Sequence, residues 1–141
     1  MIDDRSGEGI CVIDLDTVMP GSILYDFGDS VRLGAATAAE DERDLEKVGF
    51  DIEMLDRLAA GYLDAARDFL GPAETDLLAF SGKLLTLECG IRFLTDHLKG
   101  DVYFKIHRPG HNLDRARTQF KMVAEMESRM DEMAGVVRKY L

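Results

Sequence analysis

Apolar residues recur at three- and four-residue spacing through most of the sequence beyond residue 50, and this periodicity predicts α-helices. Asp51 is a suitable N-cap for a first long helix, which is expected to end at Gly71. Pro72 is tolerated in the first turn of the next helix, which is expected to continue to Gly100. A chain with this pattern is expected to be mainly α.

The helix expected between Pro72 and Gly100 carries apolar residues on more than one face, so we expect it to be the central, buried helix. A last amphipathic helix is expected from about Leu113 to Tyr140. It contains a stripe of methionines, for which core packing is favoured over a promiscuous binding surface. The stripe consists of Met122, Met126, Met130 and Met133.

The first sixteen residues read as a β-hairpin, with extended residues 1–3, a turn at 5–9 and a β-branched strand at 10–14. Residues 25–33 are expected to form a short helix. Residues 34–49 contain Gly, Ala and a run of charged side chains, and they are expected to be an exposed connection. The predicted order is therefore one hairpin at 1–16 followed by a helical part over 25–141.

The composition restricts the classes of partner. The 141 residues include 27 acidic and 17 basic side chains, a formal net charge of −10, which argues against a nucleic-acid-binding surface. With 46% apolar and 31% charged residues the chain is expected to fold as one globular domain over 1–141. The sequence has no signal segment and no apolar run of membrane-spanning length, so we expect a cytoplasmic protein without a membrane partner.

The two cysteines, Cys11 and Cys89, lie in apolar stretches without a short Cys-x-x-Cys spacing. Two buried free thiols are favoured over a disulfide or a metal site.

Two acidic residues at the end of the expected second strand are candidates for binding a metal. Because side chains alternate along a strand, Asp14 and Asp16 are expected to point to the same face. A pair of carboxylates suits Mg²⁺, which is commonly held by one or two carboxylates together with substrate phosphates. The alternative is that these carboxylates cap the following turn.

The tripeptide Asp26-Phe27-Gly28 matches the metal-binding Asp-Phe-Gly of protein kinases, but a match of three letters is weak. The apolar run before Asp14 is much stronger than the run before Asp26. We therefore expect Asp14 to be the metal ligand and Asp26 to be a helix cap or a structural acceptor.

Several separated segments together resemble the C-terminal part of the aminoglycoside phosphotransferase and choline kinase superfamily. They are CVIDLDTVMPGSILYDFGDSVR, AAEDERDLEKV, LECGIRFLTDHLKGDVYFKI and HNLDRARTQF. Within this superfamily the chain is most similar to the bacterial N-acetylhexosamine 1-kinases. The resemblance implies the helical C-lobe of a protein-kinase-like fold, with the hairpin at its N-terminal edge.

The resemblance also implies roles for individual residues. Asp14 matches the aspartate that coordinates the Mg²⁺ bridging the phosphates of ATP, and Asp16 is a candidate partner of this site. Arg92 and Tyr103 match an arginine and a tyrosine of the hexosamine pocket. From the residues alone, the alternatives are an i, i+4 ion pair between Arg92 and Asp96 and an ordinary core position for Tyr103.

Parts of the family pattern are absent from the sequence. It contains no His-x-Asp…Asn catalytic loop, no Gly-rich phosphate loop and no strand lysine with a glutamate partner. Met1 resembles an internal hairpin residue, so we expect a fragment, a truncated product or a remnant. ATP and Mg²⁺ are implied for the whole family, but we do not expect this chain to bind them productively.

Two functions follow as expectations. The first is the truncated C-lobe of a sugar kinase that phosphorylates the anomeric hydroxyl of N-acetylglucosamine or N-acetylgalactosamine, nearly inactive alone. The second is a non-catalytic helical module that binds a ligand or a protein. Apolar surface normally covered by the missing lobe is expected to promote self-association.

Overall fold

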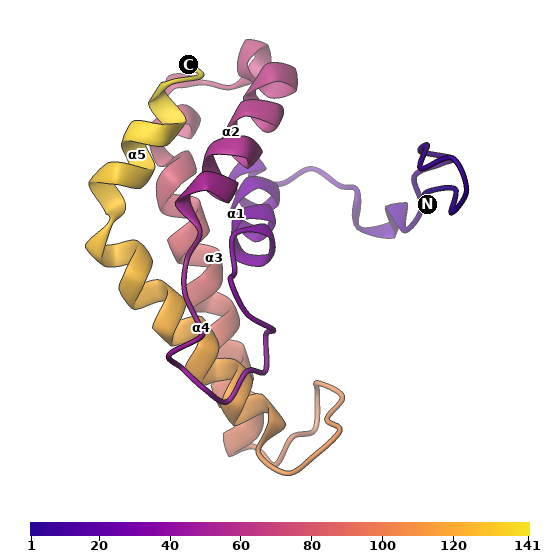
Figure 1. Cartoon of the computed structure of the whole chain (residues 1–141), viewed down its shortest axis with the longest axis vertical. Coiled ribbons are helices and arrows are strands. Elements are labelled where there is room, and N and C mark those ends of the chain that lie inside the picture. The colour runs from indigo at the N-terminus through magenta and orange to yellow at the C-terminus, as the bar shows by residue number, and fades with distance from the viewer.

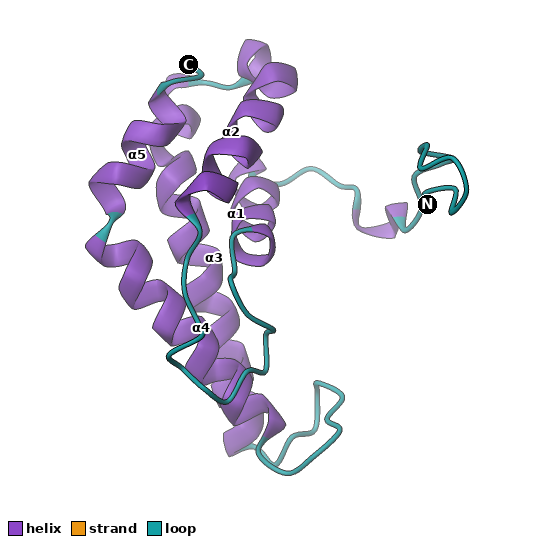
Figure 2. Cartoon of the chain, viewed as in Figure 1, coloured by secondary structure: helices purple, strands orange, loops and turns teal.

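The computed structural model describes all residues 1–141 and contains five α-helices and no sheet (Figures 1 and 2). The expectation of a mainly α chain is confirmed. Single turns of 3-10 helix, η1 and η2, lie at Leu15–Thr17 and Arg67–Phe69. None of the helices combines the length and apolar character needed to cross a membrane. The helices are α1 (Ile23–Gly34), α2 (Ile52–Ala66), α3 (Pro72–Leu98), α4 (His111–Ser128) and α5 (Met130–Arg138).

The predicted starts of α2 and α3 are confirmed. The carboxylate of Asp51 accepts the backbone N–H groups of Glu53 and Met54, at 2.9 and 3.1 Å, and so caps α2. Pro72 is the first residue of α3, and the carboxylate of Glu74 accepts the backbone N–H of Gly71 at 2.7 Å. In each helix an acidic side chain thus satisfies backbone N–H groups at the N-terminal end.

The longest helix, α3, contacts α1, α4 and α5, while α2 lies against α1 and α5 (Figure 1). The core between these helices contains the predicted methionines, because Met122, Met126 and Met133 are buried and Met130 packs against them. Other large side chains of the core are Phe27, Leu55, Leu63 and Leu78. The methionine stripe thus fills the core, as expected.

The contact between α1 and α3 depends on two glycines. A Cβ atom placed on Gly28 would lie 2.7 Å from the backbone oxygen of Ser81, and one on Gly82 would lie 2.8 Å from Cγ1 of Val31. An alanine at either position would not fit without a shift of the neighbouring atoms. The two helices therefore approach more closely than ordinary side chains permit.

The exposed face of α3 corrects the expectation of a fully buried central helix. One side of α3 packs on its neighbours, while apolar side chains on the opposite side face solvent. The exposed ones are Leu77, Phe80, Leu84, Ile91 and Leu98. The second apolar face of α3 thus has no packing partner within the monomer.

The last expected helix is two helices, interrupted at Arg129. The hydroxyl of Ser128 donates to the backbone oxygen of Glu125 at 2.8 Å, a bond that competes with the helical pattern and bends helices. The guanidinium of Arg129 donates to the backbone oxygen of Phe50 at 3.1 Å. A single helix over Leu113 to Tyr140 was therefore the wrong prediction, and the break lets α5 turn towards α2.

The connection between α1 and α2 is more ordered than the sequence indicates. Ala36 and Phe50 form an isolated antiparallel bridge, and Val48 and Phe50 are buried. The backbone N–H of Phe50 donates to a carboxylate oxygen of Glu125 at 2.9 Å, so α4 and the residue after α4 hold both backbone groups of Phe50. The connection over residues 34–49, which was expected to be exposed, is thus held against the helices by burial and hydrogen bonds.

The N-terminal arm, residues 1–21, extends away from the helices (Figure 1). Its first residues turn back on themselves: Ile2 and Gly9 form an antiparallel bridge, and the N–H groups of Asp3 and Ile10 donate to the backbone oxygens of Glu8 and Met1 at 2.9 and 3.0 Å. The expected hairpin is thus reduced to this short pairing, with no strand at residues 10–14. η1 contacts no other element, and residues 4–22 are all exposed. An isolated two-stranded hairpin is marginally stable in water, which explains why the pairing does not extend further along the arm.

Candidate functional site

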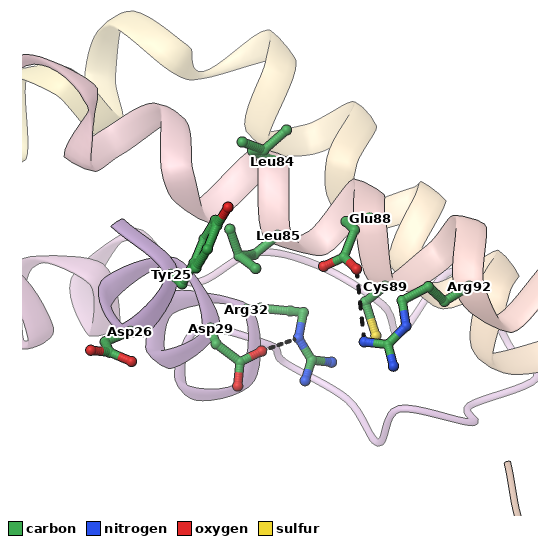
Figure 3. A pocket seen from close by; sticks show the side chains of 9 residues that line it. All are labelled: Tyr25, Asp26, Asp29, Arg32, Leu84, Leu85, Glu88, Cys89 and Arg92. Carbon is green, nitrogen blue, oxygen red and sulfur yellow. Dashed lines mark hydrogen bonds and ion pairs between the residues drawn. The ribbon is translucent and has the colours of Figure 1, made fainter. Parts of the chain in front are cut away.

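A groove of about 820 Å³ lies between α1 and α3 (Figure 3). Its walls combine apolar, aromatic and charged side chains, the mixture typical of sites for small polar molecules. From α1 it takes Tyr25, Asp26, Asp29 and Arg32, and from α3 it takes Leu84, Leu85, Glu88, Cys89 and Arg92.

Arg32 organises the α1 wall of the groove. Its guanidinium donates to the carboxylates of Asp29, at 2.7 Å, and Glu40, at 2.9 Å. Burial alone would lower the pKa of Arg32, but its acidic neighbours outweigh burial and raise that pKa above its ordinary value. Arg32 therefore stays charged and fixed, while the nearby carboxylate of Asp26 makes no hydrogen bond or ion pair within the chain.

Arg92 lies at the opposite wall, where its guanidinium and that of Arg32 reach the same end of the groove from different helices (Figure 3). It forms an ion pair with Glu88 at 3.7 Å, not the pair with Asp96 that was considered as an alternative. Its guanidinium also lies 6.0 Å from the ring centre of Tyr103 and 5.4 Å from that of Phe104. The structure thus brings together the two residues expected to bind substrate.

Tyr103 is not an ordinary core residue, because 73% of it is exposed. Its ring packs edge-on against Phe104, whose ring contacts Phe93 of α3. This aromatic contact leaves the outer face and the hydroxyl of Tyr103 open to solvent beside Arg92.

Asp96 fixes the loop that carries Tyr103. Its carboxylate accepts the backbone N–H groups of Val102, Tyr103 and Phe104 at 3.0, 2.8 and 2.9 Å, and the side-chain amide of Asn112 at 2.9 Å. Burial alone would raise the pKa of Asp96, but these backbone N–H groups and Lys99 outweigh burial and lower that pKa. From the sequence, Asp96 was considered only as an ion-pair partner of Arg92, so its role as an acceptor for the loop was missed.

The expected metal ligands lie outside the groove, on the N-terminal arm. Asp14 has a left-handed backbone with φ of 65°, and Asp16 lies in η1. Because residues 10–14 form no strand and a turn follows, the alternation that placed both carboxylates on one face does not apply. Asp14 occupies the N-cap position of η1 without a side-chain capping bond, so the capping alternative is not seen either.

The chain by itself gathers no group of three or more His, Cys, Asp or Glu side chains suitable for a metal ion. Carboxylates are appropriate donors for Mg²⁺, but the chain brings no third ligand to Asp14 and Asp16. A complete metal centre is therefore not formed by these residues, and the assignment of Asp14 and Asp16 stays a prediction.

The Asp26-Phe27-Gly28 tripeptide has a packing explanation. Phe27 is 1% exposed and belongs to the core, and Gly28 faces the backbone of α3 at close distance. Asp26 lies in the first turn of α1, where Ser22 is the N-cap, and its carboxylate accepts no hydrogen bond. Neither the expected helix cap nor the expected structural acceptor is therefore seen at Asp26. Phe27 thus serves the core and Gly28 the contact between α1 and α3.

Both cysteines are free, but only Cys89 is shielded, which corrects the expectation of two buried thiols. Burial is the main cause that raises the pKa of Cys89, with Arg32 acting in the opposite direction. We therefore expect an aromatic disulfide reagent at neutral pH to label Cys11 rapidly and Cys89 at least about tenfold more slowly. The rates are measured by absorbance, with Cys11→Ser and Cys89→Ser assigning each phase. Equal rates would contradict the placement of Cys89 in the wall of the groove.

No protein-family model matches the chain. Of the groove residues, sequence reasoning identified only Arg92 as a binding residue, and it discussed Asp26 and Cys89 in other roles. The side chains of Tyr25, Asp29, Arg32 and Glu88 were missed, because only the packing of α1 on α3 brings them together.

Proposed function

We propose that the chain is the helical, sugar-binding part of an ATP-dependent kinase similar to the N-acetylhexosamine 1-kinases. One observation carries the proposal: Arg92 lines the groove and lies beside the exposed ring of Tyr103, although the two are on different elements. These are the residues that the resemblance assigns to the hexosamine pocket. The resembling segments CVIDLDTVMPGSILYDFGDSVR and LECGIRFLTDHLKGDVYFKI contribute both walls of the groove and the loop beside it.

The groove residues are suited to an amino sugar. The guanidinium of Arg92 donates hydrogen bonds to hydroxyl or N-acetyl oxygens, and the carboxylates of Asp26 and Glu88 accept bonds from sugar hydroxyls. The rings of Tyr25 and Tyr103 are exposed and offer flat apolar surfaces to the C–H face of a pyranose. The proposed ligand is therefore N-acetylglucosamine or N-acetylgalactosamine.

Phosphoryl transfer needs groups that these residues do not supply. Asp14 and Asp16 are the residues that would hold Mg²⁺, which neutralises the phosphates of ATP when it is bound. The chain has no His-x-Asp…Asn loop to position the sugar hydroxyl and no Gly-rich loop to cover the nucleotide. We therefore propose sugar binding without turnover by these 141 residues alone, and a cytoplasmic location belongs to the same proposal.

Titration of the chain with N-acetylglucosamine and N-acetylgalactosamine, followed by calorimetry or NMR, tests the proposal. We expect weak binding, with Arg92→Ala and Tyr103→Ala each raising Kd by roughly tenfold, because each removes a polar or stacking contact to the ligand. Arg138→Ala is the matched control, since Arg138 is an exposed arginine of α5 far along the chain from the groove.

Two results would contradict this proposal. The first is no binding of either sugar, and the second is binding that Arg92→Ala and Arg138→Ala weaken equally. Formation of a sugar phosphate from ATP by the purified chain would overturn the expectation of inactivity.

A non-catalytic binding module is the second candidate, and the exposed apolar residues of the arm and of α3 favour it. Addition of a separately expressed ATP-binding lobe with a catalytic loop distinguishes the two. Sugar phosphorylation by the mixture supports the kinase proposal, whereas association without catalysis supports the binding module.

A further inference from the structure

The exposed face of α3 has a regular spacing that the monomer does not use. Seven apolar residues follow one another at alternating intervals of three and four, with no polar residue among them. They occupy the a and d positions of three heptads, and we call them the α3 stripe: Leu77, Phe80, Leu84, Leu87, Ile91, Leu94 and Leu98.

The α3 stripe lies opposite the face that packs on the rest of the molecule. Gly82, Thr86, Gly90 and Phe93 are buried. Five members of the stripe are between 40% and 77% exposed, while Leu87 and Leu94 are half-buried. A strict a/d stripe is narrower than the apolar face of an ordinary surface helix and is the pattern of a seam between two helices. The stripe runs from Leu77 to Leu98, which is 22 residues and about 32 Å of helix. It therefore offers a second helix a continuous surface for knobs-into-holes packing.

The charges beside the stripe indicate what the second helix is. Lys83 is at a g position and Glu88 is at the e position of the next heptad. In a parallel pair of helices, a g residue faces the e residue of the partner's next heptad. Two parallel copies of α3 would thus place Lys83 of each copy opposite Glu88 of the other, twice by symmetry.

An antiparallel pair does not satisfy these charges. There, e residues face e residues, and the e positions of α3 are Ser81, Glu88 and Thr95, none of which is basic. The two charges already have partners within the monomer, but both pairs are long: Lys83 lies 3.5 Å from Glu127, and Glu88 lies 3.7 Å from Arg92. The pair of Glu88 is exposed on both sides and therefore weak, whereas Lys83 is half-buried beside an exposed Glu127. The charges therefore favour a parallel partner with the sequence of α3 itself.

We propose that the α3 stripe is the interface of a parallel homodimer of this chain. The apolar seam supplies the driving force for association, and the Lys83–Glu88 pairs set the orientation and the register. The interface shares Leu84 and Glu88 with the wall of the groove. The dimer is tested without any ligand, so its failure and the failure of sugar binding are distinguishable.

Sedimentation velocity of the full chain at tens of micromolar tests the dimer. We expect a dimer for the parent protein and a monomer for Ile91→Glu, with unchanged helicity by circular dichroism because Ile91 is exposed. The matched control is Phe69→Glu, a charge placed on an apolar residue that is 67% exposed outside the stripe. This control is expected to remain a dimer.

Charge exchange tests the orientation. Lys83→Glu and Glu88→Lys are each expected to raise the dimer dissociation constant roughly tenfold, because each places like charges opposite one another. The double exchange is expected to restore the parent value, since the pairs then reform with the signs reversed. Glu88 is exposed and Lys83 is half-buried, and neither belongs to the core, so this comparison holds even if Ile91→Glu fails to fold.

A disulfide tests the register directly. In a parallel dimer, Ile91 faces its own counterpart, whereas in an antiparallel pair an a residue faces a d residue. We expect Ile91→Cys in a Cys11→Ser background to give a crosslinked dimer with copper–phenanthroline as the oxidant, and Cys11→Ser alone to give none.

Three results would overturn the proposal. A parent chain that sediments as a monomer excludes the dimer. A dimer that tolerates Ile91→Glu but is lost when residues 1–21 are deleted assigns the interface to the N-terminal arm. A dimer without rescue by the double exchange and without the Ile91→Cys crosslink is not parallel.

Discussion

Replacement of Asp96 by asparagine is expected to lower the Tm of the chain by roughly 5–10 °C, because the variant loses charge-assisted hydrogen bonds at a buried position. Asp96 is only 4% exposed, and its carboxylate accepts three backbone N–H groups and the amide of Asn112. An asparagine keeps the shape but has one oxygen, and its own NH₂ group faces donors. The loop that presents Tyr103 is expected to loosen together with the C-terminal end of α3.

The effect of this substitution is expected to depend on pH in a defined direction. The pKa of Asp96 is lowered in the folded chain, so its ionised form stabilises the fold above the unfolded pKa of about 3.9. That contribution is lost as the pH falls through the lower folded pKa. The difference in Tm between parent and Asp96→Asn is therefore expected to be constant near neutral pH and to shrink in acid.

Thermal unfolding followed by circular dichroism measures both effects. Asp64→Asn is the control, since Asp64 is an exposed acid of α2 without a side-chain partner. A variant Asp96→Asn that melts like Asp64→Asn at neutral pH would show that the hydrogen bonds of Asp96 contribute little.

Substitution of Gly28 by alanine is expected to reduce the free energy of unfolding by about 1–3 kcal/mol, the usual cost of excess volume in a packed contact. The added methyl group meets the backbone oxygen of Ser81 at 2.7 Å, and a backbone atom within a helix cannot move aside as a side chain does. Helices α1 and α3 must separate, which also changes the groove between them.

Gly61 provides a matched control within α2, because nothing lies within 4 Å of the position its Cβ would take. Gly61→Ala is expected to raise the free energy of unfolding by about 0.5–1 kcal/mol through helix propensity alone. Asp26→Asn is expected to leave it unchanged. Urea unfolding of the three variants measures these differences, and equal effects at Gly28 and Gly61 would refute the close contact of α1 and α3.

Local sequence signals predicted most of the helical pattern. Asp51, Pro72 and Gly100 mark helix ends through capping and backbone preferences that act within a few residues, and the structure confirms them. The break at Arg129 was missed because it depends on the backbone of Phe50, a contact 79 residues away. The hairpin is present only as a short antiparallel turn-back over residues 1–10. The expected strand at residues 10–14 is absent because β-branched residues need a surface to pack against, and the arm has none in this chain.

The candidate site was only partly predictable for the same reason. Arg92 and Tyr103 came from the resemblance, and the structure places them side by side. The partners of Arg92 in the groove come from α1, so no spacing along the sequence reveals them. Asp96 had a recognisable position near the C-terminal end of a helix, before Gly100 and a loop, but its acceptor role appears only when that loop folds back.

The hydrogen bonds of Glu125 and Arg129 to the backbone of Phe50 affect the order in which the chain folds during synthesis. These bonds join residues separated by 75 and 79 positions, and Lys139 reaches Asp56 across 83. A nascent chain that still lacks α4 and α5 holds the connection between α1 and α2 only through its own local bonds, such as the bridge between Ala36 and Phe50. During synthesis from the N-terminus, the first three helices are therefore expected to lack the long-range bonds of this connection until the C-terminal helices emerge.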